Sequence, residues 1–218
     1  IIKLWNFTAP TYIMYDFINV KGGNGKMSSS KGDVVTLNDV LEVYEPEIVR
    51  YIFAGTRANR EFAISFDVDV ITTYEEFDRV ERLFFDVETA NEKKTAQAKA
   101  AYKLSAVKEI PKSMPYQPGF RHLTTVLQIN QLDVDKTIGF FENELKNEFD
   151  KERLRTRAIC VKNWLEKYAP EEFKFSVQKK CQVKVDEKIR LLLQKIAEKL
   201  IEKEWTDKEL HEDIYILT

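Results

Sequence analysis

The sequence has 218 residues, of which 44% are hydrophobic and 32% charged, which is typical of a soluble globular protein with a sizeable core. The formal net charge of −2 excludes a polycation, so any contact with nucleic acid must come from a local basic patch. No apolar run approaches the roughly 20 residues of a membrane helix, and no signal-peptide pattern occurs at the start. We therefore expect a cytoplasmic protein with no membrane partner.

The two cysteines, Cys160 and Cys181, lack the spacing of a metal-binding motif and are predicted to be reduced thiols, with no metal site in the chain. The sequence opens with Ile1-Ile2-Lys3-Leu4 and without an initiator Met. From this opening we expect a piece of a larger protein.

The first 86 residues predict short strands alternating with helices. Residues 12–20 are rich in aromatic and β-branched residues and end at glycines, which predicts a strand. Thr36, followed by Leu-Asn-Asp, resembles a capping box and predicts the start of a helix. Pro46 and Gly55 are typical of the first and last residues of a second helix.

The same region continues with a second strand and a longer helix. Alternating apolar residues predict a strand over residues 61–67. Helical spacing of apolar residues predicts a helix over residues 69–86. The predicted order is strand, helix, helix, strand, helix.

Residues 87–118 differ from the sequence on either side. An Ala/Lys-rich piece leads into residues 110–118, which hold three of the six prolines, so we predict a linker and a domain boundary. From residue 119 onward the pattern is helical and predicts a bundle. Two apolar stripes carry this prediction: Leu154, Ala158, Val161, Leu165 and Tyr168, and then Ile189, Leu193, Ile196 and Leu200.

The segment Val20 to Val34, VKGGNGKMSSSKGDV, concentrates four of the seven glycines with three lysines and three serines. Backbone N–H groups freed by glycine, serine hydroxyls and lysine ammonium groups are all donors suited to phosphate oxygens. A loop that closes as charge develops on a leaving pyrophosphate stabilises the transition state more than the ground state. The segment therefore predicts a mobile polyphosphate clamp.

Three other interpretations of this segment fit less well. A Walker-type phosphate loop requires Ser or Thr after Gly25-Lys26, where Met27 stands. A serine hydrolase of the S-x-x-K kind matches Ser28 to Lys31 formally, but Gly32 interrupts the helix that this motif should open. A plain flexible connector remains open, although it leaves the combination of flexibility and charge unexplained.

The segment Lys26-Met27-Ser28-Ser29-Ser30 resembles the K-M-S-K-S signature of class I aminoacyl-tRNA synthetases. The order strand, helix, helix, strand, helix is similar to the stem-contact fold that follows the signature in that class. Within the class, the stretch from Phe17 to Val70 resembles the class I lysyl-tRNA synthetases. The resemblance is dense over residues 12–86 and depends mainly on helical pattern further on.

This resemblance implies a mainly α fold with a small α/β region. Residues 1–35 would be the end of a Rossmann catalytic domain, and residues 36–86 the stem-contact fold. Residues 87–118 would be the linker, and residues 119–218 an all-helical anticodon-binding domain.

The resemblance also implies a ligase that activates lysine with ATP, accompanied by Mg²⁺, and passes the lysyl group to tRNA-Lys. No protein nucleophile is needed, so catalysis is positioning and charge stabilisation. The implied ATP-binding residues are Lys26, Met27, Ser28, Ser29, Ser30 and Lys31, of which Lys26 and Lys31 are the catalytic ones that contact the departing phosphates. The implied loop hinges are Gly22, Gly23, Gly25 and Gly32. The candidate tRNA-binding residues are Arg153, Arg155, Arg157, Lys179 and Lys180.

Two departures from the family pattern stand out. The second lysine of the signature is replaced by Ser29, and whether Lys31, two residues later, takes its role is open. The H-x-G-H motif of the class is absent, because the only histidines are His122 and His211. The chain by itself is therefore expected to bind tRNA weakly and to catalyse nothing. His122 and Trp164 are expected to be packing residues.

Three alternative functions remain open at this point. The first is another class I synthetase, such as a glutamyl, cysteinyl or arginyl enzyme, because amino-acid specificity resides in the Rossmann part. The second is a non-catalytic helical RNA-binding module. The third is a helical protein-interaction domain whose basic surface never meets RNA.

Overall fold

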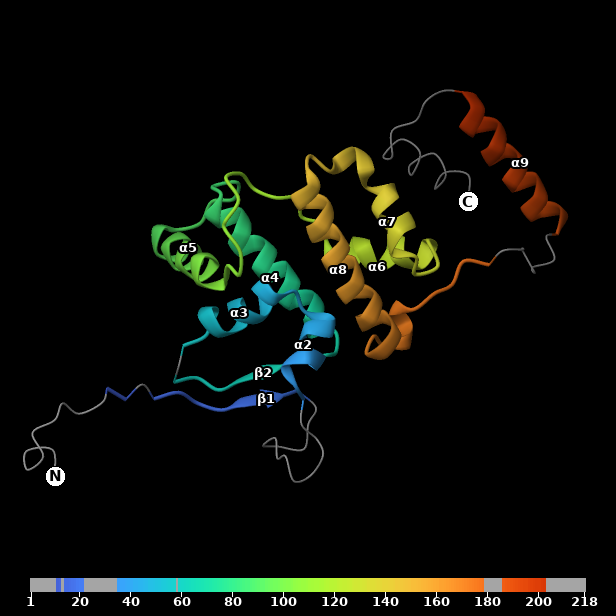
Figure 1. The fold of residues 1–218 in the computed structure, drawn as a ribbon. Coiled ribbons are helices and arrows are strands. Elements are labelled where there is room, and N and C mark those ends of the chain that lie inside the picture. Colours follow the sequence, from blue (N-terminus) through green and yellow to red (C-terminus); the bar gives the residue numbers. More distant parts are fainter. Residues whose placement is uncertain (1–10, 13, 22–34, 58, 179–185, 203–218) are drawn as a thin grey trace, which may run out of the picture. The chain divides into compact units, whose positions relative to one another are not determined.

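The computed structural model describes residues 11–12, 14–21, 35–57, 59–178 and 186–202. The chain divides into two compact units, residues 1–177 and 178–218. The first unit contains β1 (Ile18–Val20), α2 (Leu37–Val43), α3 (Pro46–Gly55), β2 (Phe62–Ile64), α4 (Asp69–Phe84), α5 (Glu92–Ser105), α6 (Phe120–Ile129), α7 (Val134–Phe140) and α8 (Glu148–Lys167). The described element of the second unit is α9 (Glu187–Glu202) (Figure 1).

The two strands pair in parallel, with Ile18 opposite Phe62. Parallel strands need a crossover connection, and α2 and α3 provide it (Figure 1). The predicted order of strand, helix, helix, strand, helix is confirmed. Both strands are shorter than predicted, and Tyr12 and Met14, which precede β1, are exposed.

Local sequence signals set the ends of the first helices as predicted. Thr36 and Asp39 form a complete capping box at the start of α2, in which each side chain accepts a hydrogen bond from the other residue's backbone. α3 begins at Pro46 and ends at Gly55. These ends follow from residue types that satisfy or tolerate the unpaired backbone groups at helix termini.

The segment 87–118, predicted to be a linker, lies within the first unit and contains a helix. α5 starts after Asn91, whose side chain accepts a hydrogen bond from the Lys94 N–H, and it packs against α3 and α4. The proline-rich part is irregular, as predicted, but hydrogen bonds connect it to α4. The Gln117 amide donates to the Asp78 carbonyl at 2.9 Å and to the Glu81 carboxylate at 2.6 Å. The functional division of the chain at this segment stays a prediction.

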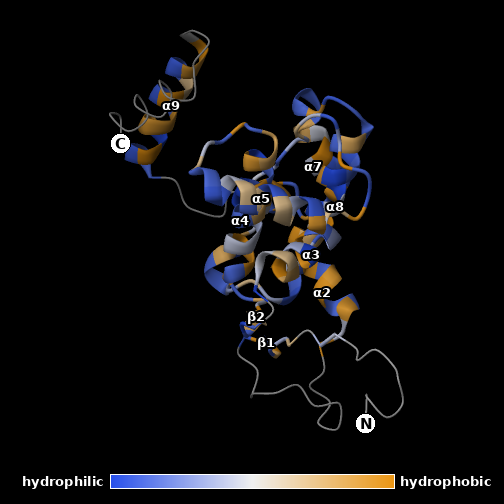
Figure 2. Cartoon of the chain, turned by 90° about the vertical axis from the view of Figure 1, so that its left-hand side faces the viewer, coloured by the Kyte–Doolittle hydropathy of each residue, from blue (hydrophilic) through white to orange (hydrophobic). Residues whose placement is uncertain are grey.

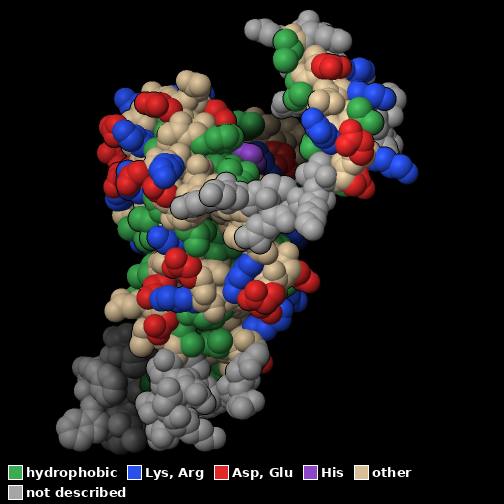
Figure 3. All heavy atoms as spheres, turned by 90° about the vertical axis from the view of Figure 1, so that its right-hand side faces the viewer, with side chains coloured by type: hydrophobic (Ala, Val, Ile, Leu, Met, Phe, Trp, Pro, Cys, Tyr) green, Lys and Arg blue, Asp and Glu red, His purple; other side chains and the backbone are tan. Residues whose placement is uncertain are grey.

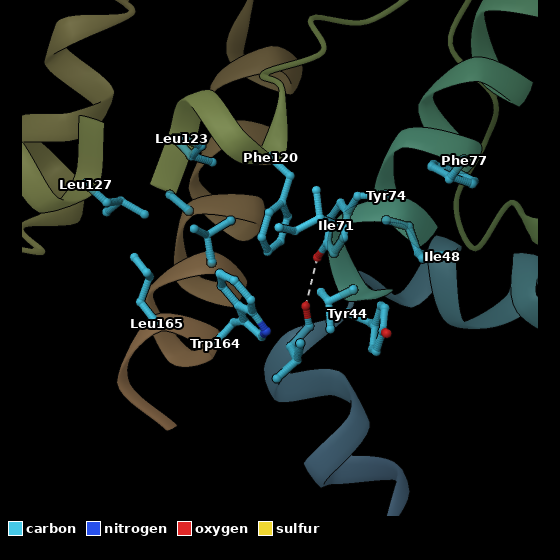
Figure 4. Close-up of a cluster of buried hydrophobic side chains, with 14 of the residues drawn as sticks. Tyr44, Ile48, Ile71, Tyr74, Phe77, Phe120, Leu123, Leu127, Trp164 and Leu165 are labelled. Atoms are coloured by element: carbon cyan, nitrogen blue, oxygen red, sulfur yellow. Dashed lines mark hydrogen bonds between the residues drawn. The ribbon is translucent and has the colours of Figure 1, made fainter. Parts of the chain in front are cut away.

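The core of the first unit is built around α8. Of the predicted stripe, Leu154, Ala158, Val161 and Leu165 are buried, as expected, while Tyr168 caps the end of α8 and is partly buried. Trp164 is also fully buried, as predicted, and its Nε1 donates to the Phe66 carbonyl at 3.0 Å. Figure 4 shows side chains of α3, α4, α6 and α8 converging here, among them Ile48, Ile71, Phe120 and Trp164. The Tyr74 hydroxyl donates to the Val43 carbonyl of α2 at 2.9 Å.

Helix α9 confirms the helix predicted from the second apolar stripe. Hydrophobic and hydrophilic residues alternate along it in Figure 2. Ile189, Leu193 and Leu200 are exposed. Cys181 and His211 lie outside the described residues, as does a last short helix that Thr206 and Glu209 would cap.

Candidate functional site

The predicted phosphate clamp lies outside the described residues, which omit positions 22–34. The assignments of Lys26, Met27, Ser28, Ser29, Ser30 and Lys31 to ATP binding, and of Gly22, Gly23, Gly25 and Gly32 as hinges, stay predictions. The structure does describe both attachments of this segment, Lys21 at its start and Val35 at its end.

Lys21 attaches the start of the segment to the sheet and to the turn after β2. Its N–H donates to the Ile64 carbonyl at 2.9 Å, which extends the strand pairing by one residue. Its Nζ lies 3.0 Å from the Asp67 carboxylate and also contacts Asp69. Hydrogen bonds to Asp69 and then to Asp67 raise the pKa of Lys21. Lys21 thus forms ion pairs with two carboxylates that follow β2, those of Asp67 and Asp69.

The turn that receives Lys21 is itself held by hydrogen bonds. The Ser65 hydroxyl donates to Asp67 Oδ1 at 2.5 Å, and the Asp69 N–H donates to the same oxygen at 2.9 Å. These two hydrogen bonds lower the pKa of Asp67, so its carboxylate stays ionised to more acidic pH. The buried Tyr44 hydroxyl donates to the Ser65 carbonyl at 2.6 Å and connects the turn to the core.

The end of the segment is attached through the N-terminus of α2. Val35 is half-buried against the hydrophobic core. The Thr36 hydroxyl and N–H both donate to Asp39 Oδ2 at 2.7 Å, and these bonds lower the pKa of Asp39. The described residues on both sides of positions 22–34 are thus hydrogen-bonded to carboxylates of the first unit.

The structure corrects the assignment of two candidate tRNA-binding residues on α8. Arg157 is fully buried, and it donates to both oxygens of Asp78, to Glu45 and to the Pro118 carbonyl. The Arg153 side chain is only 10% exposed, and its Nη1 donates to Glu81 at 2.8 Å. Arg157 is sealed from solvent and is a structural residue, while Arg153 is nine-tenths buried, so neither guanidinium group lies on the outer surface where an RNA phosphate could reach it.

The other tRNA candidates keep their status as predictions. Arg155 is on the surface of α8 and donates to Asp135 at 2.6 Å, with 45% of its side chain exposed. Lys179 and Lys180 lie outside the described residues. Figure 3 shows that acidic and basic side chains are mixed on the face of the chain that it presents.

The buried charge cluster was missed by the sequence analysis. It contains two guanidinium groups and three carboxylates, from Arg153, Arg157, Glu45, Asp78 and Glu81. Burial alone would lower the pKa of Arg157, but Glu45 and Asp78 outweigh this effect and raise it. One signal was available, because Arg157 lies three residues after Leu154 and four before Val161, within the apolar stripe.

The remaining sequence predictions concern histidine and cysteine. His122 is exposed, and its ring packs edge-on against Phe141, with ring centroids 5.5 Å apart. Cys160 is a buried free thiol. Within the part of the chain that the structure describes, no group of three or more His, Cys, Asp or Glu side chains is placed to hold a metal ion. No helix in that part combines the length and apolarity needed to cross a membrane.

Comparison with known proteins identifies the class. Residues 1–108 match the family model of the tRNA synthetases class I (K). This range includes the loop segment, both of its attachments and helices α2 to α5.

Individual relatives extend the match over most of the chain. A lysine–tRNA ligase of Borreliella burgdorferi is 44% identical over 180 residues, which are 83% of this chain and 34% of that protein. Those of Treponema pallidum and Thermococcus kodakarensis are 40% and 39% identical over 97% and 93% of the chain, covering 41% and 40% of their own lengths. The chain thus belongs to the class I lysyl-tRNA synthetase family, and it spans about a third to two fifths of the length of these relatives.

Proposed function

We propose that this chain supplies the pyrophosphate-contacting loop and a tRNA-binding surface to a class I lysine–tRNA ligase of the cytoplasm. The observation that carries this proposal is the family match over residues 1–108, because it includes the K-M-S-K-S-like segment together with both structural attachments. The similarity to lysine–tRNA ligases over at least 83% of the chain favours lysine over the glutamyl, cysteinyl and arginyl alternatives.

The chemistry proceeds without a protein nucleophile. The carboxylate of lysine attacks the α-phosphorus of ATP in line, and the bond to the β-phosphate oxygen breaks to release pyrophosphate. The 2′-hydroxyl of the terminal adenosine of tRNA-Lys then attacks the lysyl carbonyl, and AMP leaves. We expect ATP to be used as its Mg²⁺ complex, with the cation offsetting charge on the phosphates.

In this proposal the loop contributes preorganised positive charge. Lys26 and Lys31 contact the departing phosphates, while Ser28 and Ser30 donate hydrogen bonds. On either side of residues 22–34, Lys21 contacts the carboxylates of Asp67 and Asp69, and Thr36 donates to the carboxylate of Asp39. Positive charge that reaches the phosphates only as pyrophosphate leaves stabilises the transition state selectively.

The tRNA contribution comes from the helical part. After the correction of Arg153 and Arg157, the remaining candidates for phosphate contacts are Arg155, Lys179 and Lys180. Their effect on binding should depend steeply on salt, since phosphate neutralisation releases counterions.

The test is ATP–pyrophosphate exchange by the complete ligase. Lys26→Ala should lower the rate of lysyl-adenylate formation by about 10²-fold, the loss typical of removing one charge-stabilising donor. Lys112→Ala, which removes an exposed lysine outside the loop, is the matched control and should leave the rate unchanged. The isolated 218-residue chain should show no exchange. A Lys26→Ala enzyme that exchanges normally but binds tRNA poorly would contradict the proposed role of the loop.

A further inference from the structure

A pocket of about 190 Å³ lies in the first unit among α3, α4, α5, α8 and the segment 106–111. Its apolar lining includes Pro46, Phe77, Tyr102, Val107, Ile110 and Phe149. An engineered cavity of about 150 Å³ lined by apolar side chains is known to admit benzene. The volume therefore suits a ligand with a single aromatic ring.

Arg153 also lines this pocket, and among the described residues its guanidinium group makes one hydrogen bond, from Nη1 to Glu81. Its Nη1 donates to Glu81, while its Nε lies 3.8 Å from Glu45, which is too far for a hydrogen bond. Arg157, one turn further along α8, makes four hydrogen bonds and has no exposed side-chain surface. The two arginines share one charge cluster, but only Arg153 keeps donors available.

The unbonded nitrogens of Arg153 are not sealed from solvent. Among the described residues that are not exposed, every side-chain nitrogen or oxygen sealed from solvent has a hydrogen-bond partner. The unbonded nitrogens of Arg153 must therefore retain access to space, although nine-tenths of the side chain is buried. Because Arg153 also lines the pocket, a ligand there lies next to a guanidinium group that is nine-tenths buried.

The charges around the pocket indicate which kind of ligand group could accept a hydrogen bond from Arg153. The inner cluster holds three carboxylates against two guanidinium groups, so a further anion would meet net negative charge. The outer lining includes Glu47, Glu109 and Glu152 against Lys108. A neutral carbonyl suits the inner end, and a cationic group suits the outer end.

We propose that this pocket is a binding site for a small aromatic amide, with the amide carbonyl accepting from Arg153 and a cationic substituent facing the outer carboxylates. The ring packs between Phe77, Tyr102 and Ile110. The pocket is not suited to ATP or tRNA, because the negative charge around it disfavours phosphate groups. An occupant contacts α3, α4, α5 and α8 together, and so stabilises their packing.

The experiment uses the full 218-residue chain and measures binding of 4-(aminomethyl)benzamide by calorimetry and ligand-observed NMR. Val107→Trp fills the pocket from α5's C-terminal side, and the matched control Leu104→Trp places the same ring at an exposed position of α5 outside the lining. We expect Val107→Trp to weaken binding at least about tenfold, equivalent to ~1.4 kcal/mol, and Leu104→Trp to leave it unchanged. Thr156→Trp, from the opposite wall, should repeat the loss if Val107→Trp proves unstable.

Two reference ligands test the hydrogen-bond and charge arguments. Benzamide should bind more tightly than toluene, which lacks an acceptor, and more tightly than benzoate, which adds negative charge. Three results would overturn the proposal: no detectable binding of the aminomethyl amide at about 10 mM, far above the range of specific ligands; equal binding to both tryptophan variants; or tighter binding of benzoate than of benzamide.

Discussion

Both carboxylate oxygens of Asp78 accept hydrogen bonds from Arg157, at 2.9 Å from Nη1 and 2.8 Å from Nη2, and this bidentate pair joins α4 to α8 in the interior. Glu45, next to the start of α3, accepts from Nε of the same guanidinium at 2.5 Å. Charge-assisted bidentate pairs are among the stronger hydrogen-bonded contacts in proteins. One arginine thus connects three helical elements that are far apart in the sequence.

Replacing Arg157 should destabilise the fold strongly. Arg157→Met keeps much of the side-chain volume but leaves Glu45 and Asp78 buried without their cation, which should lower the free energy of unfolding by about 3–5 kcal/mol. Arg155→Met on the same helix removes only an exposed pair with Asp135 and should cost less than about 1 kcal/mol. Urea unfolding of both variants gives the comparison. Equal losses would show that burial of the cluster does not control its contribution.

Asp67 should make part of the free energy of unfolding depend on pH in the acidic range. Hydrogen bonds from Ser65 and the Asp69 backbone hold its pKa below the ordinary value of 3.8. A lowered folded-state pKa gives stability that is complete above the unfolded-state pKa and is lost as pH falls through the folded-state value. Asp67→Asn should therefore lose less stability than the parent between about pH 4 and pH 2.

Thermal unfolding at a series of pH values measures this effect. Asp16→Asn is the control, because Asp16 is exposed and none of its hydrogen bonds involves a charged partner among the described residues. Its pH profile should match that of the parent. If the stability of Asp67→Asn falls with decreasing pH as steeply as that of the parent, the turn after β2 does not hold this carboxylate ionised in solution.

The thiol of Cys160 should be unreactive in the folded protein. Burial, followed by the charge of Glu45, raises its pKa to about 12. The thiolate is the reactive form, and little of it exists at pH 8. In a Cys181→Ser background, Ellman's reagent should label no thiol in buffer and one thiol per chain in guanidinium chloride. Rapid labelling of the folded protein would show that α8 opens readily at this position.

The role of Lys31 can be separated from that of the signature lysine that Ser29 replaces. If Lys31 takes over that role, Lys31→Ala should reduce adenylate formation in the complete ligase by about 10²-fold. Adding Ser29→Lys to this variant should restore most of the rate, because it returns a lysine to the signature position. Pyrophosphate exchange measures both variants. A rate that Lys31→Ala leaves intact would assign the phosphate contacts to Lys26 alone.

Short-range features of the fold were predictable because their causes are short-range. The capping box at Thr36, the helix start at Pro46 and the helix end at Gly55 each depend on a few neighbouring residues. The apolar stripe of α8 was also predictable, since a helix with this spacing must bury that face. Strand length was less predictable: the aromatic residues before β1 have β-forming character, yet Tyr12 and Met14 are exposed and unpaired in the described residues.

For the candidate site, too, some features could be inferred from the sequence and others could not. The family was accessible from the sequence, because the residues that resemble its signature form a short contiguous segment. The anchoring of Lys21 by Asp67 and Asp69 was not accessible, since these partners lie 46 and 48 residues away along the chain. The folding of β2 against β1 brings them together.

The family and the positions of helices α2, α3, α4, α8 and α9 could be inferred from the sequence alone, because they depend on residues close together in the chain. Which charged residues are buried and which remain available follows from the packing of elements distant in the chain. Arg153, Arg155 and Arg157 look alike in sequence, but one lines a pocket, one is on the surface and one is sealed in the core. The physical reason is that the environment of a charge is set by its partners, and those of Arg157 lie 79 and 112 residues away.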